Sequence, residues 1–292
     1  MRTSGENPSR RQFLRGLGAA AVSVAVPLRA LSTAETKKAP WVEEPKGPYA
    51  PFRMALQSYS LRKFDFQKAV ETTFDLRLSF IDLWPDHFPM NLGDSEFRLH
   101  LKAMRQNLVR RIAYGVVEFT KDDDKNREIF EFAKKLNVYA VTANPAPDSF
   151  DSLDKLVEKY GIAVGVHNHG PEDKRYGTPD LIEKAIKDHN KLIGLCIDTG
   201  HFLRAGVKPV DAMKAFKERI YAVHLKDVKS EGGKQKETIV GQGDLDLVPF
   251  LRALKESGFK GGLALEYEDD PDNPVPAMKK CLEAIQDAVK KL

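Results

Sequence analysis

Polar residues that can bind metals or transfer protons follow four short apolar segments in the second half of the chain. They are His167-Asn168-His169, Asp198-Thr199-Gly200-His201, His224-Leu225-Lys226-Asp227 and Glu266. Imidazoles and carboxylates are common general acids and bases and common ligands of divalent cations. Any one of these residues could equally be a helix cap or a loop hydrogen-bond partner. Four such clusters in succession predict a single chemical site.

The segments that must position these residues alternate in type along the chain. Eight short apolar stretches rich in branched residues alternate with stretches of helical period. This pattern predicts an α/β fold, a (β/α)8 TIM barrel, with a doubly wound open sheet as the alternative. In a barrel the strand ends converge on one mouth, so the polar clusters favour the barrel. Strands are expected at 53–57, 79–83, 111–117, 138–142, 162–167, 193–198, 220–225 and 263–266, and helices at 66–76, 126–136, 150–160, 179–189, 209–217, 247–257 and from 274 onward.

The N-terminus has the features of a twin-arginine signal peptide. Arg10-Arg11-Gln12-Phe13-Leu14 precedes an uncharged run over residues 16–28 that is rich in Ala and Val. The run is too short to span a bilayer stably. We therefore expect a signal peptide over 1–34, the twin-arginine export machinery as a partner, a periplasmic location and no membrane attachment after cleavage. The proline-rich stretch 35–51 predicts a linker, and 52–292 the barrel domain.

Charge and cysteine content exclude two other classes. The chain has 46 Lys and Arg against 42 Asp and Glu, a net charge of +4, and the arginines of residues 1–34 account for all of this excess. The remaining neutral domain lacks the basic surface typical of nucleic-acid binding, so no nucleic-acid partner is expected. Cys196 and Cys281 are too few for a disulfide scaffold, and we expect both to be small buried apolar residues.

The Asp198-Thr199-Gly200-His201 and His224-Leu225-Lys226-Asp227 segments, followed by a lone Glu266, resemble the xylose isomerase-like superfamily, which includes sugar epimerases, dehydratases and endonuclease IV. The resemblance covers residues 54–268. It implies one divalent metal ion held by Asp198, His224, Glu266 and a ligand near the fifth strand. For that ligand Glu172 ranks first and His167 second. Three carboxylates with one imidazole favour Mn²⁺, with Mg²⁺, Co²⁺ or Zn²⁺ as alternatives, and His167 in place of Glu172 softens the site toward zinc or iron.

The same resemblance implies roles for the residues around the metal. The ion would stabilise an enediolate formed when a carbon next to a carbonyl loses its proton. The acid and base would be Glu172 and Glu266, on opposite sides of the substrate. Asp227 would orient His224. Residues expected to bind the substrate are His167, His169, His201, Lys226 and His87.

These features lead to a ranked set of functions. First comes a metal-dependent isomerase or epimerase of a sugar or oxidised sugar, and second a lyase or dehydratase of a keto-polyol or a 3-keto-glycoside. An endonuclease IV-like nuclease and a non-catalytic sugar-binding barrel are more remote. A small sugar is the expected substrate, and a homo-oligomer is compatible with the sequence.

Overall fold

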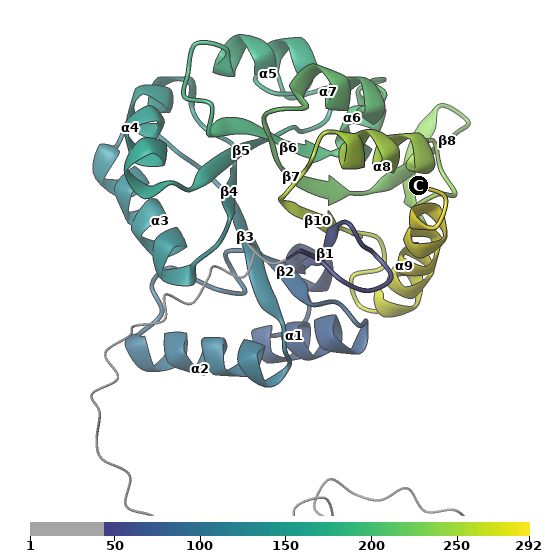
Figure 1. Ribbon diagram of the computed structural model, residues 1–292, viewed down its shortest axis with the longest axis horizontal. Helices are drawn as coiled ribbons and strands as arrows, with labels where there is room; N and C mark the ends of the chain where they lie inside the picture. Colours follow the sequence, from purple (N-terminus) through teal and green to yellow (C-terminus); the bar gives the residue numbers. More distant parts are fainter. Residues whose placement is uncertain (1–43) are drawn as a thin grey trace, which may run out of the picture. The chain divides into compact units, whose positions relative to one another are not determined.

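Eight parallel strands form a closed barrel in the computed structural model, which describes residues 44–292 (Figure 1). Neighbouring strands follow the order β1-β10-β7-β6-β5-β4-β3-β2. The predicted TIM barrel is therefore confirmed, while the predicted signal peptide and residues 35–43 of the predicted linker lie outside the described residues. The strands are β1 (Arg53–Gln57), β2 (Phe80–Leu83), β3 (Arg110–Val117), β4 (Ala140–Ala143), β5 (Ala163–His167), β6 (Ile193–Asp198), β7 (Ile220–Leu225) and β10 (Gly262–Leu265).

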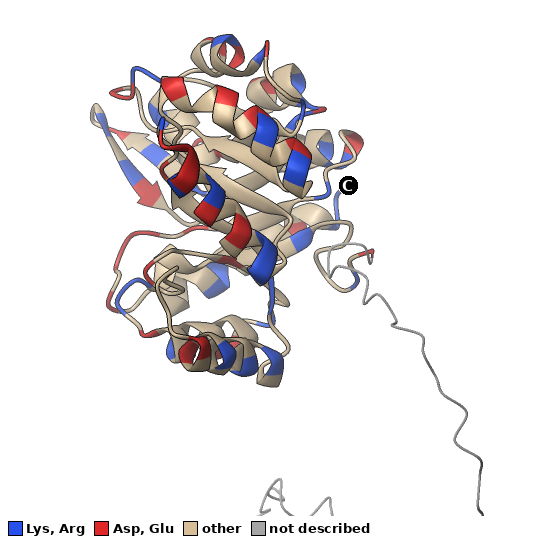
Figure 2. Cartoon of the chain, turned by 90° about the vertical axis from the view of Figure 1, so that its left-hand side faces the viewer, with Lys and Arg blue, Asp and Glu red and all other residues tan. Residues whose placement is uncertain are grey.

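Helices surround the barrel and cover its outer surface (Figure 1). Their charged residues lie on the outward faces, while the strands of the barrel carry few charges (Figure 2). This distribution gives each strand apolar neighbours on both sides. Within residues 44–292, no helix is both long and apolar enough to span a membrane. The helices are α1 (Phe66–Asp75), α2 (Asp94–Gln106), α3 (Asp123–Leu136), α4 (Phe150–Tyr160), α5 (Pro179–Ile186), α6 (Thr199–Arg204), α7 (Pro209–Phe216), α8 (Leu247–Glu256) and α9 (Val275–Val289), with short 3-10 turns η1 (Ser58–Leu61) and η2 (Pro147–Ser149).

Capping residues define several of the helix ends that the sequence predicts. Asp65 precedes α1, and its Oδ1 accepts a hydrogen bond from the Lys68 backbone N–H at 2.8 Å. Gly161 ends α4 in the left-handed conformation, with φ of 64°. Helix α2 was not predicted. Only Phe97, Ala103 and Met104 are buried in it, which leaves little apolar periodicity to detect.

An antiparallel hairpin follows β7 and was also not predicted. It consists of β8 (Asp227–Glu231) and β9 (Lys234–Thr238), joined by Gly232-Gly233 with positive φ at both positions. Such a two-glycine turn suits the twist of a tight hairpin. The strands are mostly charged and exposed, so they lack the apolar alternation that predicts a buried strand.

Candidate metal centre

Four buried side chains converge at the carboxyl ends of neighbouring strands. His167 ends β5, Asp198 ends β6, His224 lies within β7, and Glu266 directly follows β10. Each offers one ligand atom, and these atoms all lie within 4.8 Å of one another. Because β5, β6, β7 and β10 are neighbours in the barrel, residues far apart in the sequence meet at one mouth.

Buried atoms of all four residues form no regular hydrogen bond among the described residues, and most of them lie 3.0–3.4 Å from one another or from the Lys226 ammonium group. These atoms are both ring nitrogens of His167, Oδ2 of Asp198, Nδ1 of His224 and Oε2 of Glu266. Burying several charged and polar groups at one point is costly, so this convergence needs a physical reason. Two imidazoles and two carboxylates are a donor set that fits a divalent cation. The four residues could therefore hold such an ion.

The protonation states of His167, Asp198 and Glu266 suit this role. Burial lowers the pKa of His167 to about 3, so its ring is neutral and can donate a lone pair. Burial opposes ionisation of Asp198, but the charge of Lys226 outweighs it and holds the pKa of Asp198 well below its ordinary value. The same balance, with Lys226 and His224 as neighbours, lowers the pKa of Glu266. Both carboxylates are thus anionic at neutral pH. At His224, burial opposes protonation, but neighbouring Cys196, Glu266 and Asp82 outweigh it and raise the pKa well above its ordinary value, so the ring must release a proton when a metal binds.

Asp82, on β2, contacts His224 from the side opposite Glu266. Asp82 Oδ2 lies 3.0 Å from Nε2 of His224, and Glu266 Oε2 lies 3.1 Å from Nδ1. Asp82 is 1 % exposed. A carboxylate on the second nitrogen of a metal-binding histidine fixes the ring and its tautomer. The sequence indicates a weak functional signal at Asp82 but no specific role, because Asp82 lies inside β2 between Ile81 and Leu83.

Lys226 is a buried cation between the carboxylates. Its Nζ lies 3.0 Å from Asp198 Oδ2 and 3.3 Å from Glu266 Oε2, and it also pairs with Glu268. Burial opposes charge on Lys226, but Asp198, Glu266 and Glu268 together raise its pKa well above the ordinary value. The ammonium group therefore stays charged inside the site.

Short polar links hold the strand ends in register. Asn168 donates from Nδ2 to the carbonyl oxygen of Asp198 at 3.0 Å, and its Oδ1 accepts from the Asp198 N–H at 2.8 Å. Thr199 Oγ1 accepts from the Lys226 N–H at 2.8 Å. A Cβ on Gly200 would lie 3.0 Å from the Lys226 side chain, so glycine leaves room for that chain. These links explain why Asn168, Thr199 and Gly200 accompany the charged residues.

A cavity of about 260 Å³ opens onto the site. Its wall includes the Tyr59 and Trp84 rings, which pack edge to face with centroids 5.1 Å apart. Of the four converging residues, His167 and Glu266 line this cavity. Larger hollows lie elsewhere, including one of about 730 Å³ that none of the four residues lines. The chemistry of the lining therefore identifies the site better than volume does. The titratable side chains lining the smaller cavity are Tyr59, His167, His169, His201, Lys226, Glu266 and Glu268.

The structure brings most of the predicted site residues together, but not Glu172. Asp198, His224 and Glu266 form the cluster with His167, the second-ranked candidate for the fourth position. Glu172 is exposed in the loop after β5, where its carboxylate lies against Gly170. The loop turns back on itself, because Asp173 donates its N–H to the Gly170 carbonyl at 3.0 Å.

Two further residues have contacts that differ from the prediction. Asp227 does not orient His224: its carboxylate accepts N–H groups of Gly241, Gly243 and Leu245 at 2.9–3.0 Å and thus fixes the loop before α8. His87 does not line the site cavity. It is buried, and its Nε2 lies 3.0 Å from the Phe64 carbonyl oxygen. By contrast, His169 and His201 both line the cavity, as expected for substrate binding.

The family pattern described as Xylose isomerase-like TIM barrel matches residues 65–288. The chain belongs to this family. Inosose dehydratase from Clostridium botulinum strain Alaska E43 is 30 % identical over 151 residues, which is 45 % of this chain and 50 % of that relative. Inosose dehydratases of other Clostridium and Bacillus strains match over similar shares. The chain thus spans about half the length of the curated relatives it matches. These relatives support an enzyme, and their names fit a dehydratase better than the isomerase that the sequence analysis ranked first.

Solved structures of the same fold cover more of the chain at lower identity. The IOLI protein with a binding zinc atom aligns with a TM-score of 0.68 at 19 % identity, over 82 % of this chain and 99 % of that one. A xylose isomerase-like TIM barrel protein from Mycobacterium smegmatis in complex with magnesium aligns with a TM-score of 0.68 at 15 % identity, over 85 % and 99 %. At these identities the likeness shows the fold alone.

Proposed function

We propose that the chain is a metal-dependent lyase that eliminates water from a keto-polyol or the leaving group from a 3-keto-glycoside. The observation that carries the proposal is the convergence of His167, Asp198, His224 and Glu266 beside a cavity that His167, Glu266 and Lys226 line. The dehydratase names of the relatives support elimination over isomerisation.

The metal is proposed to be held by these four residues. With two imidazoles and two carboxylates, Mn²⁺, Co²⁺ and Zn²⁺ fit the donor set better than Mg²⁺ does. A bound divalent ion would supply Lewis acidity toward the carbonyl oxygen of the substrate.

Glu266 is the proposed base, because its carboxylate is ionised and faces the cavity. It takes the proton from the carbon next to the carbonyl, and the electrons of the broken C–H bond form the new C=C bond. The C–O bond to the leaving group then breaks, and a protonated group must give that oxygen a proton. Burial lowers the pKa of the His201 ring, so the proposed donor, in place of the expected Glu172, is Glu266 itself, which gives the leaving oxygen the proton that it took from carbon.

Lys226 and the aromatic wall bind the substrate in this proposal. The buried ammonium of Lys226 stabilises negative charge that develops on the carbonyl oxygen. Tyr59 and Trp84 offer an apolar surface to the face of a sugar ring. The cavity of about 260 Å³ suits one small polyol or a single sugar ring.

The test is to incubate manganese-loaded protein, metal-stripped protein and Glu266→Gln with inososes, aldoses, ketoses and 3-keto-glycosides in heavy water. We expect an unsaturated product, with loss of water or of the glycoside leaving group, only from the metal-loaded unsubstituted protein. Deuterium exchange with an isomer as product would support the isomerase instead. Tight metal binding without exchange or product would support a sugar-binding barrel.

Location and partners remain predictions. The basis for a periplasmic, exported enzyme is residues 1–34, which the structure does not describe. A nuclease role remains disfavoured by the absence of net positive charge outside those residues. Comparing the cell fractions of the full chain and of an Arg10→Lys, Arg11→Lys variant would test export.

A further inference from the structure

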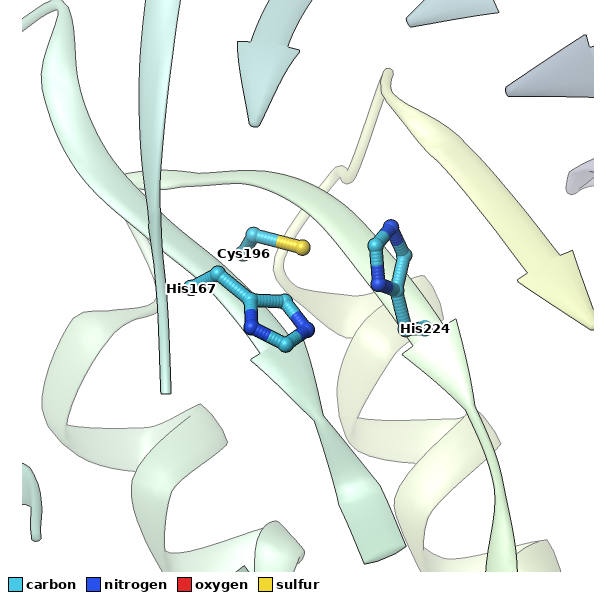
Figure 3. A group of neighbouring side chains, drawn as sticks. All are labelled: His167, Cys196 and His224. Atoms are coloured by element: carbon cyan, nitrogen blue, oxygen red, sulfur yellow. The ribbon is translucent and has the colours of Figure 1, made fainter. Parts of the chain in front are cut away.

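A thiol lies beside the two histidines of the metal centre. Cys196 precedes Asp198 by two positions in β6, so both side chains lie on the same face of that strand. Cys196 pairs in register with His167 of β5. Sγ of Cys196 and one nitrogen each of His167 and His224 lie within 4.8 Å of one another. Figure 3 shows the two rings, from β5 and β7, on either side of the thiol.

These three side chains are buried, as the ligands of a metal ion usually are, and each offers a lone pair that could bind one. Cys196 and His224 are fully buried, and His167 is 4 % exposed. Among residues 44–292, Nδ1 of His167 has no hydrogen-bond or ion-pair partner, and Nε2 of His167 and Nδ1 of His224 contact the carboxylates of Asp198 and Glu266, respectively. In tetrahedral zinc sites, bonds of about 2.0–2.3 Å place ligand atoms about 3.3–3.8 Å apart. A contraction of about an ångström would therefore bring the three atoms to the spacing that zinc requires.

We propose that the metal centre has two overlapping ligand sets. The outer set consists of Asp198 and Glu266 with the two histidines, and the inner set consists of Cys196 with the same two histidines. The inner set takes a thiophilic ion such as Zn²⁺, and the thiol releases its proton to solvent as the ion binds. Because both sets need His167 and His224, an ion in one set excludes an ion from the other.

The inner set lies deeper in the barrel, because Cys196 is two residues nearer the start of β6 than Asp198. Thiolate ligation favours zinc and cobalt over magnesium and manganese. The identity of the ion therefore decides its depth and whether Glu266 binds it. The inference rests on the metal centre of the proposed function, but not on the reaction proposed there.

Cobalt is the probe, because thiolate bound to Co²⁺ absorbs in the near ultraviolet. Metal-stripped protein is titrated with Co²⁺, and absorbance is compared for the unsubstituted chain, Cys196→Ser and Cys281→Ser. Cys281 is a matched control, since it is equally buried but lies in α9, where its Sγ is 3.4 Å from the Val240 backbone nitrogen. Cys196→Ala is a second variant, and circular dichroism reports the folding of all three.

We expect a charge-transfer band in the unsubstituted protein and in Cys281→Ser, and its loss in Cys196→Ser and Cys196→Ala. Zinc affinity should fall by about tenfold to a hundredfold in both Cys196 variants, while manganese affinity stays unchanged. Stoichiometric cobalt binding without the band, or a band that survives both Cys196 variants, overturns the inner set and leaves the proposed lyase standing. Failure of cobalt, zinc and manganese alike to bind overturns both. The spectrum of the unsubstituted protein tests the inference even if a Cys196 variant does not fold.

Discussion

Asp82 and Glu266 contact opposite nitrogens of the same imidazole, that of His224. The two distances, 3.0 Å to Nε2 and 3.1 Å to Nδ1, place a carboxylate on each side of the ring. Glu266 is one of the four converging residues and Asp82 is not, so the Nδ1 side of the ring faces the candidate metal site. Burial opposes protonation of His224, but neighbouring Cys196, Glu266 and Asp82 raise its pKa well above the ordinary value. A bound cation must therefore displace the proton on Nδ1, while Asp82 holds the proton on Nε2.

The first prediction concerns this contact. Asp82→Asn should lower manganese affinity by about tenfold to a hundredfold, because the ring loses the anion that fixes its tautomer. Isothermal titration of metal-stripped protein measures the affinity. Asp86→Asn, an exposed change four residues along the same segment, is the control and should leave affinity unchanged. Equal affinities for the two variants would contradict the role of Asp82.

The second prediction separates His167 from Glu172. His167→Gln should reduce manganese affinity by about tenfold or more, because it removes one of four converging ligands. Glu172→Gln should leave it nearly unchanged, because the Glu172 side chain is exposed outside the cluster. The same titration measures both variants. If Glu172→Gln loses affinity and His167→Gln does not, the loop after β5 must rearrange to bind the metal.

The sequence predicted the parts of the site that depend on strand ends. Asp198, His224 and Glu266 each follow an apolar run, and parallel strands bring such ends together. The choice between His167 and Glu172 depends on how a loop turns, which spacing along the chain does not specify. The resemblance ranked Glu172 first, whereas the structure places His167 in the cluster.

The other differences between prediction and structure have two causes. Some contacts join residues that are far apart in the sequence, and some residues that are near in the sequence do not contact each other. Asp82 and His224 are 142 positions apart, so no local pattern connects them. Asp227 was expected to orient His224 because it is near in sequence, but it lies at the start of the hairpin and binds three loop N–H groups instead. The barrel itself was predictable because its apolar alternation repeats eight times. The charged hairpin has no such pattern.

The third prediction concerns the buried ammonium of Lys226. Without metal, Lys226→Met leaves the carboxylates of Asp198 and Glu266 buried with no ammonium partner. We expect the free energy of unfolding in a chelator to fall by about 3–5 kcal/mol, the usual cost of breaking a buried ion pair. Manganese should restore part of the lost free energy of unfolding, because a bound cation neutralises the same carboxylates.

Urea unfolding with chelator and with manganese measures both effects. Lys229→Met is the control, because the Lys229 side chain is 52 % exposed and pairs only with Glu231 among the ion pairs of residues 44–292. A surface pair of this kind contributes at most about 1 kcal/mol. If the two variants lose equal stability, Lys226 does not compensate the charge of the site.

The fourth prediction uses the pH dependence of stability at His87, which lies outside the site cavity. Burial lowers the pKa of His87, although the Phe64 carbonyl oxygen and the charges of Asp86 and Asp65 oppose the shift. The folded ring therefore resists protonation, while the unfolded ring has a pKa of about 6.5. As pH falls below that value, the unfolded chain binds a proton that the folded chain does not. The contribution of His87 to stability is thus present above about pH 6.5 and is lost below it.

His87→Gln keeps an N–H donor for the Phe64 carbonyl and removes the titrating ring. At pH 7.5 the variant should be less stable than the unsubstituted protein, because the packing of His87 against Trp84 is disturbed. Toward pH 5.5 the gap in unfolding free energy should narrow by up to about 1.4 kcal/mol, which corresponds to one pH unit below the unfolded pKa. Urea unfolding at both pH values, with manganese held constant, gives the gap. A gap that widens toward low pH would mean that the folded protein binds the proton, and that His87 is not held neutral by burial.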